Sequence, residues 1–241
     1  MKILAHTPLI ISRKGFPRND NGEPYLPGYV VTESIISSLI YYYVKRDREI
    51  GSKVKKYLLK EGLHPEEVKK HVKKIIFEKF KFDDVFRIPE IIRLRYGKLY
   101  ETIVEIFDLK KWEEVDYFRV EVFEGTIDVA MSEELVDRIK PAAQSFANAL
   151  LRMEKEFLKG HPLNESFYVP MSNEIKKWYV PLRLGLWAEV KYSGNLLFFW
   201  KIKEVRDRFL RDYKVDIRPS RVFLLPREGV TPGWAELRKE V

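Results

Sequence analysis

The chain has 241 residues, 45% apolar and 33% charged, a composition typical of a globular protein with a hydrophobic core of its own. It contains no cysteine, which excludes disulfides, thiolate metal sites and a thiol nucleophile. No run of eighteen apolar residues occurs, so we expect no membrane span and a cytoplasmic location. Abundant Lys and Glu without cysteine also favours a thermophilic source.

The first predicted elements are a strand and a helix. Residues 3–11 form an apolar, β-branched run that predicts a strand. Pro24, Pro27 and Gly28 predict a turn, and the apolar periodicity behind them predicts a helix over 30–44. The start of that helix would present free backbone N–H groups and the positive end of the helix dipole, which favour a phosphate.

Residues 45–112 predict a basic, largely helical insertion. Between Lys45 and Lys81, thirteen Lys and Arg stand against six Asp and Glu, so most of the net charge of +8 lies there. These lysines are interleaved with apolar residues at helical spacing, which predicts amphipathic helices with one basic face. Such a face is either a solvated surface or a phosphate-binding patch, and charge alone slightly favours the solvated surface.

The second half of the chain predicts strands around one long helix. Residues 115–131 alternate polar and apolar around Gly125, which predicts a β-hairpin or a bulged strand. Ser132 followed by two glutamates predicts the N-cap of a helix that ends near Gly160. Further strands are expected at 178–190 and 196–202.

Without the insertion, the order is strand, helix, strand, strand, helix, strand. This is the order of ferredoxin-like (RRM-like) α+β domains, a fold that RNA-recognition modules use. We therefore predict a single body over 1–241 with a β-α-β-β-α-β core, a basic helical insertion over 45–112 and a C-terminal β extension over 191–241. Many unrelated proteins share this order, so it does not establish function.

Four short patches of the sequence carry a family resemblance. They are the strand Thr7–Ile11 ("T-P-L-x-I-G" in the family), the turn and helix start Tyr25–Ser34, the segment Arg119–Val129 ("E-V-I-P-x-G-T-x-F") and the ending Arg221–Leu237. Together they resemble the RAMP superfamily of CRISPR-associated proteins. The ending is most similar to the fifth subunit of the type III-A (Csm) effector complex. The resemblance implies a non-catalytic subunit that contacts the backbone of CRISPR RNA, caps a filament of related subunits in antiviral defence and needs no cofactor.

The chain departs from the family at the usual RNA surface. The helix start holds Thr32, Glu33 and Ile36 where the family places a basic side chain, and the first loop is not glycine-rich. The expected RNA contacts are Arg13, Lys14, Arg18, Arg183 and Arg221, with Lys53, Lys56, Lys70 and Lys74 as a secondary patch. Trp234, in the proline–glycine turn, is expected either to plug a hinge or to lie at an interface with another effector subunit. Phe199 is expected in the core or at such an interface.

Evidence for catalysis in the sequence is slight. Of the four histidines only His6 lies in a family-relevant strand, and a structural role is favoured for each. The alternative is a metal-independent endoribonuclease that processes CRISPR RNA, with His6 as base and a lysine as transition-state clamp. No metal-binding or nucleotide-binding motif occurs. A protein–protein scaffold whose charge only keeps it soluble is the third possibility.

Overall fold

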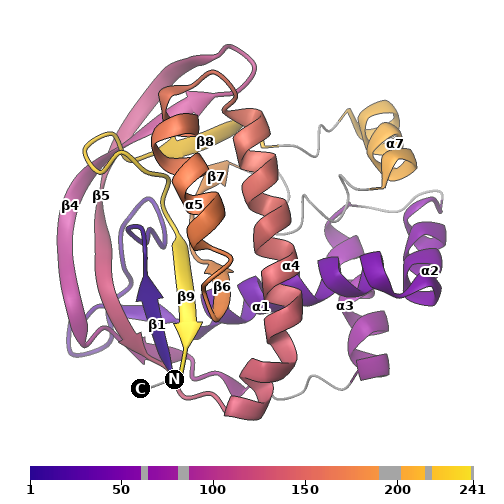
Figure 1. Cartoon of the computed structure of the whole chain (residues 1–241), viewed down its shortest axis with the longest axis horizontal. Helices are drawn as coiled ribbons and strands as arrows, with labels where there is room; N and C mark the ends of the chain where they lie inside the picture. Colours follow the sequence, from indigo (N-terminus) through magenta and orange to yellow (C-terminus); the bar gives the residue numbers. More distant parts are fainter. Residues whose placement is uncertain (61–64, 81–86, 190–201, 215–218, 240–241) are drawn as a thin grey trace.

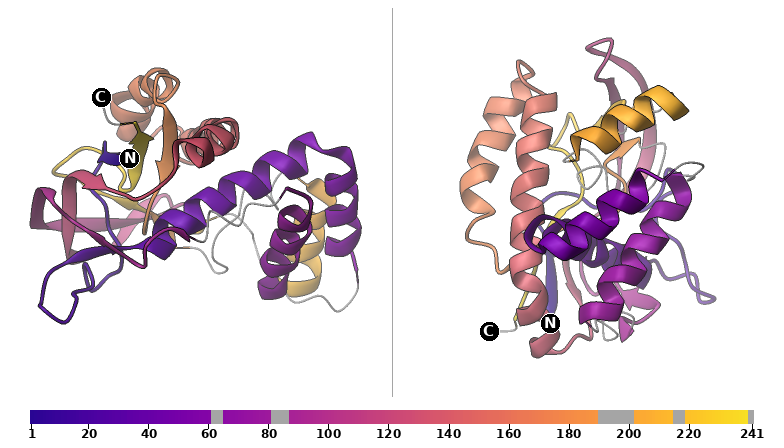
Figure 2. Two further views of the ribbon diagram at one scale, coloured as in Figure 1. Left: turned by 90° about the horizontal axis from the view of Figure 1, so that it is seen from below. Right: turned by 90° about the vertical axis from the view of Figure 1, so that its right-hand side faces the viewer.

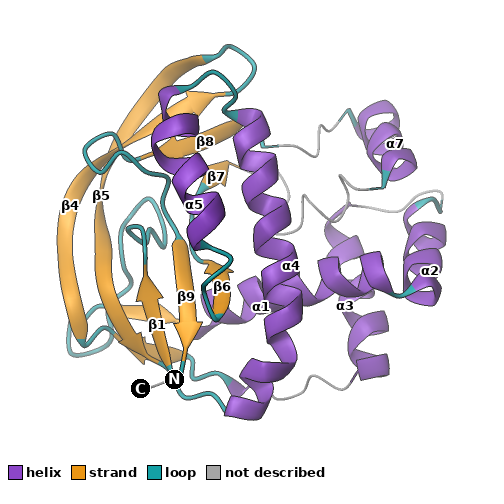
Figure 3. Cartoon of the chain, viewed as in Figure 1, coloured by secondary structure: helices purple, strands orange, loops and turns teal. Residues whose placement is uncertain are grey.

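The computed structural model describes residues 1–60, 65–80, 87–189, 202–214 and 219–239. Figures 1 and 3 show a curved sheet on one side of the molecule and helices on the other. The strands are β1 (Lys2–Ala5), β2 (Tyr25–Pro27), β3 (Ile91–Arg93), β4 (Tyr96–Asp108), β5 (Glu113–Asp128), β6 (Val180–Arg183), β7 (Ala188–Glu189), β8 (Arg221–Leu224) and β9 (Trp234–Arg238). The helices are α1 (Gly28–Arg46), α2 (Arg48–Leu58), α3 (Pro65–Phe80), α4 (Glu133–Phe157), the π-helical turn η2 (Asn164–Tyr168), α5 (Val169–Glu174) and α7 (Lys203–Tyr213).

Among the described residues, seven strands form one antiparallel sheet in the order β6-β9-β1-β5-β4-β8-β7, and β2 pairs with β3 separately. Strands β6 and β7 lie at opposite ends of this order, yet only residues 184–187 join them. The sheet therefore curls back so that its two edges approach one another. The predicted α+β class with an antiparallel sheet is confirmed.

Helices α1 and α4 pack against each other and bury one face of the sheet. Helix α1 contains the predicted range 30–44. Of the four residues that the periodicity places on its buried face, Ile36, Leu39 and Ile40 lie in the core and Tyr43 is half-buried. The predicted cap of α4 is also confirmed, because the Ser132 hydroxyl accepts a hydrogen bond from the Leu135 N–H at 3.2 Å.

A helical lobe, defined as α2, α3 and α7, projects from the sheet on the C-terminal half of α1 (Figure 2). Its helices bury apolar side chains at helical spacing, namely Ile50, Val54, Leu58, Val72, Ile76, Val205 and Phe209. Arg208 of α7 donates to the Leu58 carbonyl at 3.1 Å, and Lys55 pairs with Glu204 at 2.6 Å. The C-terminal extension therefore completes the insertion, which the sequence did not predict.

The predicted insertion was too long and the predicted hairpin was misplaced. Strand β4 lies inside the 45–112 range, and β5 runs unbroken through Gly125. The hairpin turns at 109–112 instead. Gly125 has φ +144° and faces Gly97 across the strands, so close that a Cβ on either would overlap the neighbouring backbone. The glycine permits a close approach inside the sheet and does not mark a turn.

The strand beside β1 in the sheet is β9, from the end of the chain, rather than the one that follows α4. The strand predicted at 178–190 is split into β6 and β7, with Gly185 between them in the left-handed region at φ +70°. The strand predicted at 196–202 lies almost wholly outside the described residues. No helix among the described residues is long and apolar enough to cross a membrane.

Candidate nucleic-acid interface

The helical lobe carries the predicted lysine patch on its exposed surface. Lys56 and Lys70 are exposed and have no ion pair among the described residues. Lys53 pairs with Glu49 at 2.6 Å, and Lys74 lies 3.8 Å from Glu78, both one helical turn apart. Because exposed pairs of this kind are weak, all four ammonium groups remain accessible to an anion.

The N-terminal loop holds three of the predicted cations at the surface. The guanidinium of Arg13 lies 5.1 Å from the ring centre of Phe118, a cation–π contact that positions it above the sheet. Lys14 is exposed. Arg18 pairs with Glu121 at 2.9 Å and donates to the Gly22 carbonyl at 3.2 Å, so part of its charge is already neutralised.

Arg221 anchors the β4–β5 hairpin. Its Nε lies 3.4 Å from the carboxylate of Asp108, and its side chain is 39% exposed. The N–H groups of Lys111 and Lys110 hold the pKa of Asp108 below its usual value, and Arg221 adds to this effect. The Arg221 guanidinium thus binds the carboxylate that caps the β4–β5 turn, while part of the Arg221 side chain remains exposed to solvent.

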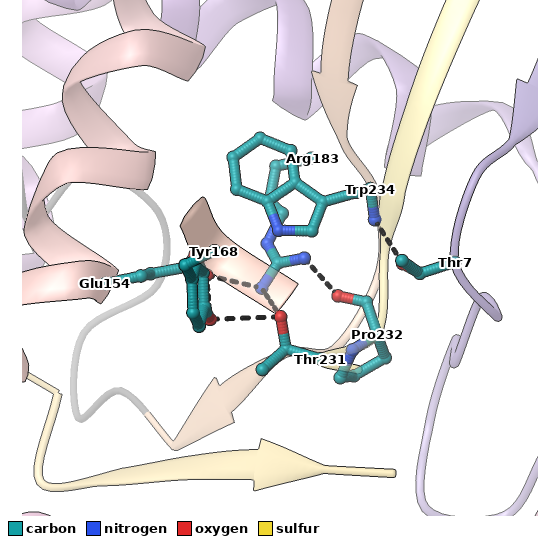
Figure 4. Close-up of polar contacts among 7 residues, drawn as sticks. All are labelled: Thr7, Glu154, Tyr168, Arg183, Thr231, Pro232 and Trp234. Carbon is teal, nitrogen blue, oxygen red and sulfur yellow. Dashed lines mark hydrogen bonds and ion pairs between the residues drawn. The ribbon is translucent and has the colours of Figure 1, made fainter. Parts of the chain in front are cut away.

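Arg183 is buried, which contradicts its predicted contact with a phosphate. Its side chain is 3% exposed and pairs with Glu154 of α4 at 3.1 Å. It also donates to the carbonyl of Pro232, and Tyr168 donates to Glu154 at 2.6 Å (Figure 4). Burial lowers the pKa of Arg183 and the carboxylate of Glu154 raises it. A guanidinium committed in this way joins α4, β6 and the segment before β9.

Trp234 is fully buried, so its predicted place at a subunit interface is wrong. Its indole ring centre lies 4.5 Å from the guanidinium carbon of Arg183, and its backbone N–H donates to the Thr7 hydroxyl at 2.9 Å. Its carbonyl accepts from the N–H groups of His6 and Thr7. The first and last family-like patches therefore lock together inside the fold. Phe199, the other predicted interface residue, lies outside the described residues.

The first N–H group of the predicted phosphate cradle at the start of α1 already donates to the chain itself. The Gly28 N–H donates to the Glu90 carbonyl at 2.8 Å, and Pro27 has no N–H to offer. A Cβ at Gly28 would overlap the carbonyl oxygen of Pro89, so the glycine is explained by this contact. Anion binding in this region therefore depends on side chains around the helix start rather than on its first N–H group.

His6 is engaged on both sides of its ring. It stacks on Trp178 with ring centres 3.8 Å apart, and its Nε2 lies 3.2 Å from a carboxylate oxygen of Glu236. Burial lowers the pKa of His6, and the Glu236 carboxylate counteracts this effect. This setting supports the structural role favoured from the sequence. Among the described residues, no group of three or more His, Asp or Glu is placed to hold a metal ion.

Sequence reasoning missed the exposed cations Arg93 and Arg95, which flank the end of β3. Neither has an ion pair or side-chain hydrogen bond among the described residues. The segment Ile91–Lys98 alternates cations with apolar and aromatic residues, a pattern that predicts a strand with a basic face. It was overlooked because the surrounding charge was interpreted as helical.

No known family model matches this chain. An uncharacterised protein of Aquifex aeolicus (strain VF5) is 36% identical to it over 242 residues, which covers the whole of both proteins. This chain belongs to the family of that Aquifex protein.

Solved structures share the fold at low sequence identity. A chain in the cryo-EM structure of a Csm–crRNA–target RNA ternary complex, from a type III-A CRISPR-Cas system, matches 93% of this chain and 75% of its own length, with TM-score 0.55 and 17% identity. The crystal structure of T. onnurineus Csm5 matches 91% of this chain and 72% of its own length, with TM-score 0.52 and 15% identity. The expected resemblance is therefore confirmed for the fold, which this chain shares with Csm5 and with a chain of a Csm complex.

Proposed function

We propose that this protein is a Csm5-like subunit of a type III CRISPR effector complex that holds CRISPR RNA. The observation that carries the proposal is the match of nearly the whole chain to a chain of a Csm–crRNA–target RNA complex and to Csm5. This match includes the core of the fold. In that core, the two family-like patches around Thr7 and Trp234 form one buried junction. These patches are thus explained as determinants of the fold.

The surface supports binding to an RNA backbone. The accessible lysines of the helical lobe lie in the stretch that contains most of the net positive charge of the chain. Arg13 and Lys14 add exposed cations on the sheet side. Contacts of this kind neutralise phosphates without reading bases, so sequence would be read by base pairing of the bound RNA.

The proposed role is non-catalytic. His6, the candidate base, is stacked on Trp178 and paired with Glu236, an arrangement that supports the sheet edge. The family resemblance adds two further parts to the proposal: the subunit caps a filament of related subunits, and its partners are the other effector proteins.

The experiment is a salt titration of the purified protein with labelled CRISPR RNA, with RNA integrity followed on a gel. The double variant Lys56→Ala/Lys70→Ala removes two accessible lysines of the lobe. We expect weaker binding and a salt slope reduced by about 1.4, since each phosphate contact on a single strand contributes about 0.7. Lys159→Ala, an exposed lysine at the end of α4, is the matched control and should bind as wild type.

Three outcomes separate the hypotheses. Intact RNA bound with a steep salt slope supports the structural subunit. Discrete cleavage in the absence of metal, lost in His6→Ala, would favour the endoribonuclease. Weak binding with a shallow slope in the wild type would favour a protein scaffold.

A further inference from the structure

The outward face of the small β2–β3 sheet is exposed at Ile91 and Arg93 in the part of the chain that the structure describes. The register pairs Tyr25 with Arg93, and on the opposite face Leu26 and Ile92 are buried in the core. On the outward face Ile91 is 47% exposed and Arg93 is exposed. This strand buries one face and exposes an apolar residue beside a cation on the other. Such a face suits a ligand that has both an apolar surface and a negative charge.

An exposed tyrosine follows each end of this strand pair in the chain. Tyr29, 64% exposed, lies on the first turn of α1 directly after β2. Tyr96, 59% exposed, follows β3 and Arg95. We call Tyr29, Ile91, Arg93, Arg95 and Tyr96 the β2–β3 platform. Tyr29 follows the end of the strand pair where Pro27 faces Ile91, and Tyr96 follows the end where Tyr25 faces Arg93.

The charge of the platform is uncompensated. Neither arginine has an ion pair or side-chain hydrogen bond among the described residues. The hairpin offers a contrast, because its exposed Tyr117, 66% exposed, faces Glu105 across the strands and lies beside Asp116. An anionic ligand is therefore attracted to the platform and repelled from the rings of the hairpin.

We propose that the β2–β3 platform binds single-stranded RNA, with bases stacked on Tyr29 and Tyr96 and phosphates held by Arg93 and Arg95. Stacking on an aromatic ring requires an unpaired base face, so the ligand is a single strand and not a duplex. Exposed aromatic rings interleaved with free cations are the combination that single-strand binding proteins use. The proposal rests on the function proposed above and adds a specific site to it.

Helix α1 separates this site from the helical lobe. The platform lies at the start of α1 and the lobe at its end, and a helix of 19 residues spans about 28 Å. Substitutions at the two places therefore test different surfaces.

The test uses the full-length protein and a single-stranded oligoribonucleotide that carries 2-aminopurine, whose fluorescence falls when it stacks on an aromatic ring. Tyr29→Ala and Tyr96→Ala should each raise Kd by about 5-fold to 100-fold and reduce the fluorescence change. Their salt slope should equal that of the wild type, because no charge is removed. Arg93→Ala/Arg95→Ala should instead lower the slope by about 1.4. Tyr117→Ala is the matched control for an exposed tyrosine and should bind as wild type.

The possible outcomes show whether the platform proposal fails by itself or together with the proposed RNA-binding function. If both tyrosine variants keep the thermal stability and the RNA affinity of the wild type, while the lysine variants of the lobe lose affinity, the platform is refuted and the RNA role stands. If the platform variants lose affinity for duplex RNA as much as for single strands, base stacking is refuted. If the wild type binds no RNA, both proposals are wrong.

Discussion

The buried pair of Arg183 and Glu154 gives the sharpest test of the fold. Replacing Arg183 with Met introduces an apolar side chain of similar length and removes the cationic partner of the Glu154 carboxylate in the core, which keeps the Tyr168 hydroxyl as a donor. It also removes a donor from the Pro232 carbonyl and the cation that faces the Trp234 indole. Because the Glu154 carboxylate is nearly inaccessible to water, water cannot replace the cation that compensates its charge.

The magnitude follows from this loss of compensation. Breaking a buried ion pair from one side destabilises a protein by about 3–5 kcal/mol. For a chain of this size each kcal/mol lowers Tm by about 2–4 °C, so Arg183→Met should melt about 6–20 °C below wild type. Adding Glu154→Gln removes the uncompensated charge while an amide oxygen still accepts from Tyr168. The double variant should therefore recover a large part of the loss.

Thermal and urea unfolding of the wild type, both single variants and the double variant complete the cycle. A strongly positive coupling energy between Arg183 and Glu154 is the expected result. If Arg183→Met unfolds like the wild type but loses affinity for RNA, Arg183 is a phosphate contact after all. The structural account of this network would then be wrong.

Other substitutions probe the sheet and the junction of the chain ends. Gly125→Ala should lower the free energy of unfolding by about 2–4 kcal/mol because of a backbone clash as well as a positive φ, whereas Gly22→Ala, with open space around it, should lower it by about 1–2 kcal/mol. Both are measured by urea unfolding, and equal losses would contradict the clash. Thr7→Val leaves the Trp234 N–H without its acceptor and should cost about 1–3 kcal/mol in the same assay, while Thr7→Ser should be nearly neutral. The pKa of Asp108 is depressed in the folded state, so its stabilisation is present above its unfolded pKa of about 3.9 and is lost as pH falls through the folded value. Melting curves should show this acid loss in the wild type and not in Asp108→Asn, and parallel curves would refute the assignment.

Local signals predicted the elements whose determinants are local. Helix α1 follows from its proline–glycine turn and apolar periodicity, and the start of α4 follows from the Ser132 cap. Strand β4 was missed because Glu101 and Glu105 alternate with apolar residues inside a charged stretch, where exposed carboxylates on a strand resemble those on a helix. Gly125 was interpreted as a turn because nothing in the sequence shows that Gly97 faces it.

The roles of single residues were harder to predict than the helices and strands. Arg183 was chosen from its place beside a glycine turn, but its partner Glu154 comes from another helix, and such pairing depends on the tertiary fold. Trp234 was expected at an interface because it follows a proline–glycine turn, and it fills the core instead. The platform arginines became visible only when the pairing of β2 with β3 showed which face they share.

The most direct test of the central claim is to purify the tagged full-length protein from its own host and to sequence the RNA that it carries, with subunit stoichiometry from native mass spectrometry. The account predicts RNA enriched in CRISPR repeat sequence and complexes that hold one copy of this chain beside several copies of a related subunit. A protein recovered without other subunits, with RNA that shows no such enrichment, would contradict it.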